Sequence, residues 1–477
     1  MNTVEDVLII VVDALRADRV GNPEDRNRWL TPAIDSIGEA GMAYENCYAC
    51  TNVTDSSMTT IATGQYPARH GVINHASRVT DEERQLVSAS KNVSQLLPNH
   101  VTTFAVDKLG RWHERGFETY EFPSEESEKS FMRNRLRMVK NSLPSRFHTP
   151  LEYMYGAIVS GNDAEGPNIS HARADAVTNR ALENIKTANG PWFGLVHYWD
   201  VHLPYPNLEE VDTLQLPNST ALKETIAPIR GSPWYNQLTN NLVQDGSTVE
   251  KLQQQYDQAV QFVDREIGRL LDRLNQIGVR DNTAIVVTAD HGESFTEHNI
   301  FFDHHGLYDQ SIHVPLLITG PDLKAQGSHF VQHFDLAPTV LDWFDVGYDA
   351  NRFDGKSLLS EEWSRDASGR DAIYAEEAHT CRRRAVRTKA YKYIEATAET
   401  TTCRYCNIEH APKRELYDLR TDPNEITNVV DEREDVAHRL ATLLENWYQS
   451  IPKSAKEPID FGRDDVAVER LESMGYI

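Results

Sequence analysis

The apolar run Val7-Leu-Ile-Ile-Val-Val12 ends directly at Asp13, and this stretch decides the fold class. A continuous run of β-branched and aliphatic residues predicts a strand that is buried on both faces, as in parallel sheets. Residues 191–197, 284–288 and 313–318 carry similar runs and predict further strands. The chain therefore contains several candidates for one buried sheet.

Helical patterns lie between these runs. Residues 31–41 place Thr31 at an N-cap, Pro32 at the first helical position and Gly41 beyond the end. Residues 249–277 repeat apolar side chains at helical spacing. Because strands alternate with helices, we predict an α/β sandwich with a mainly parallel central sheet.

The expected domain organisation follows from the chain length and from changes in the sequence pattern along the chain. A chain of 477 residues exceeds the size at which one core usually stops growing. We expect a catalytic domain over residues 1–364, with a polar insertion at 118–173. A small C-terminal α+β subdomain would occupy residues 365–477, with short antiparallel strands at 382–394 and a charged helix at 432–449.

The composition is acidic. The formal charge of −24 predicts a solvated surface that repels nucleic acid, so we expect no nucleic-acid partner. No apolar run approaches the roughly 20 residues of a membrane span. The acidic start does not resemble a secretory signal, so we expect a cytoplasmic protein. An anionic substrate would then need a local cation.

Acidic residues and histidines gather where the predicted strands end. A lone Asp after a strand often caps a helix, but four such places suggest one convergent site for a divalent cation. These places hold Asp13; Asp290 and His291; Asp303, His304 and His305; and His197, Asp200 and His202.

A series of short motifs runs along nearly the whole chain. It includes Val11-Val-Asp13-Ala-Leu-Arg16, Thr63-Gly-Gln-Tyr-Pro-Ala-Arg-His-Gly71, Gly110-Arg-Trp-His113, Asp303-His-His-Gly-Leu-Tyr308 and Asp335-Leu-Ala-Pro-Thr339. In this order the motifs resemble those of the sulfatase family, within the alkaline-phosphatase superfamily. The resemblance implies a hydrolase of sulfuric or phosphoric esters that uses one divalent metal ion.

The resemblance also implies roles for individual residues. The metal ligands would be Asp13, Thr54, Asp290 and His291, with Thr54 as the nucleophile. The transferred group and the leaving group would be bound by Arg111, His113, His202 and His304, and these three histidines would also take part in catalysis. Calcium is the ion that the family favours, while manganese, magnesium and zinc stay open.

The nucleophile segment departs from the family pattern. Sulfatases carry Cys-X-Pro-Ser-Arg, whose cysteine becomes formylglycine, whereas this chain reads Thr54-Asp-Ser-Ser-Met58. Ala14 stands where a second metal-binding Asp is common, and Arg111 and His304 stand where lysines are expected. Threonine cannot become formylglycine, although a hydroxyl beside a divalent cation can still attack.

The substrate is therefore expected to be a small-molecule or glycan ester. A sulfated threonine would be released slowly, which favours phosphodiesters or phosphonates over the sulfates that the resemblance suggests. Two alternatives are transfer of the phospho group to an alcohol acceptor and a catalytically inactive binding protein. The sequence makes no prediction of the oligomeric state.

Five cysteines exclude a complete set of disulfides. Cys47 and Cys50 precede Thr54 and are expected to pack as small apolar residues, with Cys50 the next candidate for the nucleophile. Cys403 and Cys406, with Cys381 and His410, have a spacing compatible with zinc, and the question stays open at this point. His70 and His75 are expected to be structural residues that form hydrogen bonds.

Overall fold

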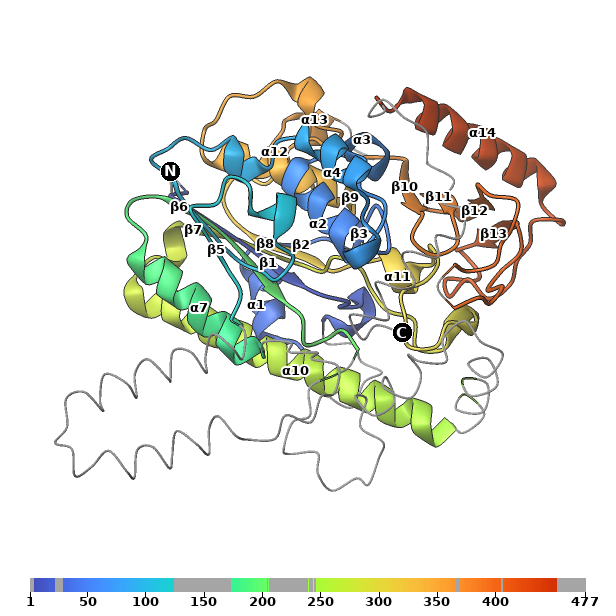
Figure 1. Ribbon diagram of the computed structural model, residues 1–477, viewed down its shortest axis with the longest axis horizontal. Helices are drawn as coiled ribbons and strands as arrows, with labels where there is room; N and C mark the ends of the chain where they lie inside the picture. Colours follow the sequence, from blue (N-terminus) through green and yellow to red (C-terminus); the bar gives the residue numbers. More distant parts are fainter. Residues whose placement is uncertain are drawn as a thin grey trace.

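A seven-stranded sheet runs through the centre of the molecule (Figure 1). The computed structural model of the 477-residue chain describes residues 4–21, 29–123, 173–203, 205, 239, 243, 246–365, 369–404 and 406–452. The strand order is β2(Met42–Ala43), β8(Leu316–Thr319), β7(Thr283–Thr288), β1(Asp6–Val12), β6(Trp192–Tyr198), β4(Thr102–Val106) and β5(Thr119–Glu121).

The central strand β1 sets the position of the candidate site. It pairs in parallel with both β6 and β7, and Val11 lies opposite His197 on one side and Thr288 on the other. Every residue of β1 is buried, as the apolar run predicts. The carboxyl ends of these three strands therefore meet at one edge of the sheet, where α/β proteins usually bind their ligands.

Helices cover both faces of this sheet (Figure 1). One face carries α1(Pro32–Ala40), α7(Ala174–Thr187) and α10(Gly246–Ile277), and the other carries α2(Thr54–Thr63) and α12(Leu336–Trp343). Shorter helices are α3(Pro67–His70), α4(Asp81–Ser88), α11(Asp309–Ile312) and α13(Glu362–Arg365). The prediction of an α/β sandwich with a mainly parallel sheet is confirmed.

A second, antiparallel sheet forms the C-terminal part. It consists of β10(Ala372–Glu377), β11(Arg383–Thr388), β12(Tyr391–Ala396) and β13(Arg414–Asp418), and α14(Glu434–Ser450) packs on it. The antiparallel sheet also shares an apolar cluster with Tyr48, Leu307 and Phe330 of the large domain. Phe330 belongs to β9(Phe330–Gln332), which pairs in parallel with β3(Asn46–Tyr48).

Local predictions differ from the structure at particular points. The expected strand at 313–318 begins only at Leu316 and runs antiparallel to β7, because α11 occupies the residues just before His313. The expected N-cap Thr31 makes no capping bond, and the carboxylate of Asp264 accepts from the amides of Ala33 and Ile34 instead.

The expected insertion at 118–173 begins with a strand of the main sheet. β5 pairs in parallel with β4, so its residues extend the sheet at its edge. Most of the remaining range lies outside the described residues, and the domain boundaries stay predictions. Among the described helices, none combines the length and the apolar character that a membrane span requires.

A buried ion cluster joins the C-terminal sheet to the large domain. Lys392 of β12 places Nζ 2.8 Å from Asp309 Oδ1 and 2.8 Å from Glu425 Oε1. Burial alone would raise the pKa of Asp309, but the charges of Lys392 and Arg387 lower it. The Asp309 carboxylate, at the start of α11, is therefore ionised at neutral pH and held by these two cations.

We expect Lys392→Met to destabilise the protein by about 3–5 kcal/mol, because two buried carboxylates lose their shared cation. Chemical denaturation at neutral pH measures the free energy of unfolding. Lys389→Met, which removes an exposed lysine near the same hairpin, is the matched control and should change stability by less than about 0.5 kcal/mol. Equal effects of the two variants would contradict the role of the buried cluster.

Candidate active site

Two carboxylates and a histidine meet at the carboxyl ends of β1 and β7. Asp13 follows β1 directly, and Asp290 and His291 follow β7 after one further residue. One ligand atom from each of the three residues lies within 4.8 Å of the others, and all three side chains are buried. His291 Nε2 lies 3.7 Å from Asp13 Oδ1 and 3.4 Å from Asp290 Oδ2.

Hydrogen bonds orient these groups toward one point. Asp290 Oδ1 accepts from the amides of Ala14, at 3.1 Å, and of His291, at 2.9 Å. His291 Nδ1 lies 2.8 Å from the Gly292 carbonyl oxygen, which can only accept, so Nδ1 carries the proton and Nε2 presents a lone pair. Among the described residues, Asp290 Oδ2 and both oxygens of Asp13 have no hydrogen-bond partner.

These unpartnered oxygens are the evidence that the site fits a divalent cation. Burial, followed by the nearby charge of Asp290, raises the pKa of Asp13. Buried carboxylates without partners are costly unless a positive charge offsets them. Two carboxylates and a neutral imidazole are suitable ligands for such a charge.

Thr54 begins helix α2 and points into this group. Its Oγ1 lies 3.2 Å from His291 Nε2. The helix is fixed to the sheet edge by Ser57, whose hydroxyl donates to the Asp290 carbonyl oxygen at 2.6 Å. The helix ends at Gly64 with a left-handed φ of +64°, where a Cβ atom would lie 2.5 Å from the ring of Phe353. The N-terminus of α2 thus faces the site, and helix N-termini favour anions.

Asp55, which the sequence analysis did not single out, organises the cations beside Thr54. Its carboxylate lies 2.8 Å from Arg111 Nη2, 3.4 Å from His113 Nε2 and 2.9 Å from His75 Nδ1. Burial alone would raise the pKa of Asp55, but the adjacent His113 and His75 rings lower it well below its usual value. Arg111 and His113 are therefore held next to Thr54 through an anion of the protein.

His202 and His304 complete a group of imidazole rings with His291. The His304 ring stacks on His291 with centroids 4.2 Å apart, and the centroid of His202 lies 5.6 Å from that of His304. Nδ1 of His304 donates to the Asn52 carbonyl oxygen at 2.5 Å, and Nδ1 of His202 donates to the Leu203 carbonyl oxygen at 2.7 Å. In the neutral form of either ring, the lone pair therefore lies on Nε2.

The protonation of His304 is set by its surroundings. Burial, reinforced by His291, lowers the pKa of His304 to about 3. The ring is therefore neutral at physiological pH before an anion binds next to it. The roles of His113, His202 and His304 in catalysis and of Arg111 in substrate binding stay predictions.

Two of the strand-end carboxylates serve other purposes. Asp200 accepts from the Ala174 amide at 3.1 Å and so caps helix α7. Asp303 lies 3.2 Å from His305 Nε2 and 3.8 Å from His304 Nε2. Neither belongs to the group formed by Asp13, Asp290 and His291.

One basic residue near the site, Lys108, was missed, whereas His197 was already among the strand-end candidates of the sequence. The charge of Lys108 opposes part of the rise in the pKa of Asp13. Lys108 Nζ lies 3.4 Å from the centroid of the Trp199 ring. His197 of β6 is buried, pairs through Nδ1 with Asp107 at 2.9 Å and lowers the pKa of Asp290. Lys108 lies just before the Gly110-Arg-Trp-His113 motif, and that proximity was the available signal.

The remaining candidates behave as structural residues. His70 is buried, accepts from the Val72 amide at 3.1 Å and contacts the Thr60 hydroxyl at 3.1 Å, as expected. Cys50 is buried beside Tyr66 and Phe334, and burial raises the pKa of its thiol. Cys47 is likewise buried in the main core. The packing of Cys50 makes Thr54 the better candidate for the nucleophile.

Comparisons with known proteins bear on the family and the fold. Residues 5–346 match the family model Sulfatase, and residues 296–450 match the model N-sulphoglucosamine sulphohydrolase, C-terminal. The chain is 24% identical over 515 aligned residues to the N-acetylglucosamine-6-O-sulfatase of Bacteroides thetaiotaomicron, covering 92% of this chain and 86% of that protein. The match to arylsulfatase K of Rattus norvegicus is 27% identical and covers 52% of this chain and 42% of that protein.

Solved structures show the same fold. A putative sulfatase from Bacteroides thetaiotaomicron superposes with a TM-score of 0.66 at 17% identity, covering 96% of this chain and 95% of that one. The phosphonate monoester hydrolase of Agrobacterium radiobacter superposes with a TM-score of 0.62 at 19% identity, covering 93% and 96%.

We expect Asp13→Asn to abolish cation binding at this site and, when this site holds no cation, to be more stable than the wild-type protein by about 1–4 kcal/mol. The reason is that the variant removes a buried charge that only a cation offsets. Thermal unfolding without and with added calcium or manganese measures both effects. Asp272→Asn, which changes an exposed carboxylate of α10, is the control and should keep the wild-type response. A full calcium- or manganese-dependent shift in Asp13→Asn would refute the ligand assignment.

Proposed function

Because the chain belongs to the sulfatase family, whose members are hydrolases that act on sulfate esters, we propose that it is a metal-dependent ester hydrolase with Thr54 as its nucleophile. The observation that carries the proposal is the position of Thr54 Oγ1, 3.2 Å from His291 Nε2. The same nitrogen lies within 3.7 Å of carboxylate oxygens of Asp13 and Asp290. Calcium is the ion that the family favours, and the imidazole ligand also suits manganese or zinc.

The metal ion would lower the pKa of an adjacent hydroxyl and offset charge on the transferred group. The protein supplies the rest. The first turn of α2 holds the Thr54 hydroxyl at the edge of the site and directs its amides there. Asp55 keeps Arg111 and His113 next to that turn, where they can contact oxygens of the transferred group.

The proposed reaction has two displacements. In the first, Thr54 Oγ1 releases its proton to solvent water and bonds to the phosphorus or sulfur atom, while the bond from that atom to the organic oxygen breaks. The organic oxygen takes a proton, for which Nε2 of His202 or His304 is the proposed donor. Binding of an anion would raise the low pKa of His304, so that Nε2 of His304 becomes protonated. In the second, water displaces Thr54 and restores its hydroxyl.

The nucleophile favours phosphodiesters or phosphonates over sulfate monoesters. Threonine lacks the geminal hydroxyl through which a formylglycine hydrate expels sulfate, so a sulfated Thr54 would persist. Met58 occupies the position of the signature arginine and is buried in the apolar core of the large domain. Arg111 is already paired with Asp55, which limits the positive charge available to a dianionic monoester.

We expect Thr54→Ala to lower kcat at least about a thousandfold, or about 4 kcal/mol of transition-state stabilisation, with the fold intact. Thr54→Ser keeps a hydroxyl and should stay within about tenfold of wild type. Thr63→Ala is the matched control, because that hydroxyl lies on the same helix and bonds only to the Thr59 carbonyl in the structure. Steady-state kinetics and circular dichroism give the two readouts. Wild-type rates in Thr54→Ala would exclude this nucleophile.

We also expect kcat/KM for a 4-nitrophenyl phosphodiester or phosphonate to exceed that for 4-nitrophenyl sulfate, measured with each divalent metal. The physical reason is the fate of the covalent intermediate on Thr54. A burst of nitrophenol followed by slow turnover is expected with the sulfate. Sulfate turnover at least tenfold above the diester, about 1.4 kcal/mol of transition-state preference, would overturn the preference.

A further inference from the structure

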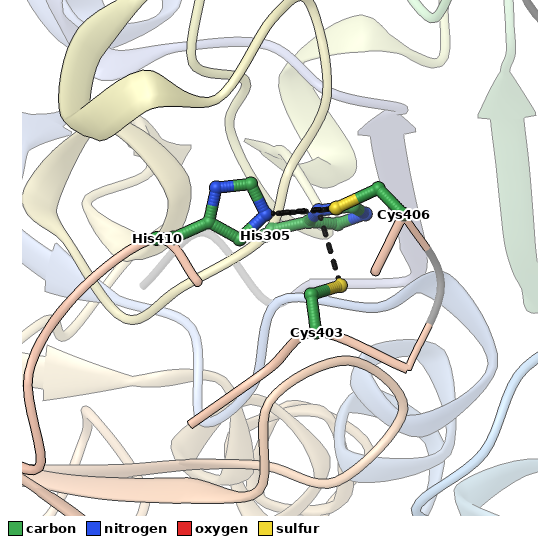
Figure 2. A group of neighbouring side chains, drawn as sticks. All are labelled: His305, Cys403, Cys406 and His410. Carbon is green, nitrogen blue, oxygen red and sulfur yellow. Dashed lines mark hydrogen bonds between the residues drawn. The ribbon is translucent and has the colours of Figure 1, made fainter. Parts of the chain in front are cut away.

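Four side chains outside the candidate active site converge on a second point (Figure 2). Cys403, Cys406 and His410 come from the connection between β12 and β13, and His305 comes from the loop between β7 and α11. One ligand atom from each lies within 4.8 Å of all the others. The open question of the sequence analysis included Cys381, but the structure places His305 in this group.

The distances match a tetrahedral zinc site with two sulfur and two nitrogen ligands. Zinc–sulfur bonds of about 2.3 Å and zinc–nitrogen bonds of about 2.0–2.1 Å put neighbouring ligand atoms about 3.3–3.8 Å apart. Cys403 Sγ and Cys406 Sγ lie 3.6 Å and 3.9 Å from His305 Nδ1. His410 Nε2 lies 3.4 Å from His305 Nδ1 and 3.0 Å from Cys406 Sγ.

The outer nitrogens of both histidines have acceptors that fix the tautomer. His305 Nε2 lies 3.2 Å from the Asp303 carboxylate, and His410 Nδ1 lies 3.1 Å from the Asn299 carbonyl oxygen. These oxygens accept the ring protons, so His305 Nδ1 and His410 Nε2 turn their lone pairs toward the sulfurs. A carboxylate or carbonyl behind each ligating histidine is the usual arrangement around protein-bound metals.

Burial decides the kind of site. The exposed fractions are 2% for His305, 1% for Cys403, 1% for Cys406 and 9% for His410. Four protein ligands in a closed environment are typical of structural zinc, whereas catalytic zinc keeps one position open for water or substrate.

We propose that His305, Cys403, Cys406 and His410 bind a structural zinc ion that joins the C-terminal sheet to the active-site loop. The ion links the β12–β13 connection to His305, which directly follows His304 in the chain. Asn52 binds His304 through two hydrogen bonds. The backbone carbonyl oxygen of Asn52 accepts from His304 Nδ1, and the side-chain Nδ2 of Asn52 donates to the His304 carbonyl oxygen at 2.8 Å. Zinc thereby holds the backbone that presents His304, without contacting the substrate.

Cobalt substitution tests the proposal independently of turnover. Cobalt bound to thiolates gives an intense charge-transfer band in the near ultraviolet, which the Asp13, Asp290 and His291 site cannot give. Wild-type protein and Asp13→Asn should both show the band and hold about one tightly bound zinc per chain before exchange. The absence of the band in both proteins, or a disulfide between Cys403 and Cys406 in freshly isolated protein, would overturn the proposal.

Variants then test the ligand set. In the Asp13→Asn background, Cys406→Ser should lose the band and at least about nine-tenths of the bound zinc. Cys381→Ala should keep both, although Cys381 hydrogen-bonds to Cys403, and Cys47→Ala is the control for a buried thiol elsewhere. Loss of zinc in Cys381→Ala would refute the assignment of His305 as the fourth ligand.

A stability measurement covers the case in which the cysteine variants do not fold. Removal of zinc from the wild-type protein by a strong chelator should lower the midpoint of thermal unfolding and expose two additional reactive thiols. Added zinc should reverse both changes, and Asp13→Asn should respond like wild type. A chelator response that is lost in Asp13→Asn would assign the effect to the active-site metal and contradict the proposal. Failure of the proposed ester hydrolysis would leave these readouts unchanged.

Discussion

The buried carboxylates of Asp13 and Asp290 are the constraint on which the site depends. They lie side by side where β1 and β7 end, and burial of two anions without a cation costs several kcal/mol. Two backbone amides on Asp290 offset part of this cost. The remaining unpartnered oxygens form a buried acidic point beside Thr54 and His291. A divalent cation bound there is the proposed counter-charge.

Both domains support this arrangement from outside. On one side, Asp55 collects Arg111 and His113 at the first turn of α2. On the other, Glu377 of the C-terminal sheet accepts from Asn52 Nδ2 at 2.9 Å and from the Gly306 amide at 3.0 Å. The C-terminal sheet thus positions the loop that carries His304. The proposed zinc ion would add metal–ligand bonds at the same junction, and these bonds are much stronger than the hydrogen bonds to Glu377.

Much of the fold and part of the site could be predicted from local sequence. The apolar run before Asp13 indicates a strand buried on both faces, because only a central parallel strand tolerates such a run. Parallel strands bring their carboxyl ends to one edge, so the grouping of Asp13 with Asp290 and His291 followed from their positions in the chain. The position of Thr54 followed from its distance to the Thr63-Gly64 motif, and the structure places it next to His291.

The sequence by itself thus determined the sheet and the meeting of Asp13, Asp290 and His291, since each depends on periodicity or on position relative to a strand end, whereas the candidate nucleophile Thr54 came from the resemblance to sulfatase motifs. Only the tertiary structure decided that Arg111 pairs with Asp55, that Asp200 caps a helix and that His305 joins the two cysteines. Cys403 and His305 lie 98 positions apart in the chain. The physical reason is that a side chain's partner is set by distances across packed segments, which local hydrophobic patterns do not encode.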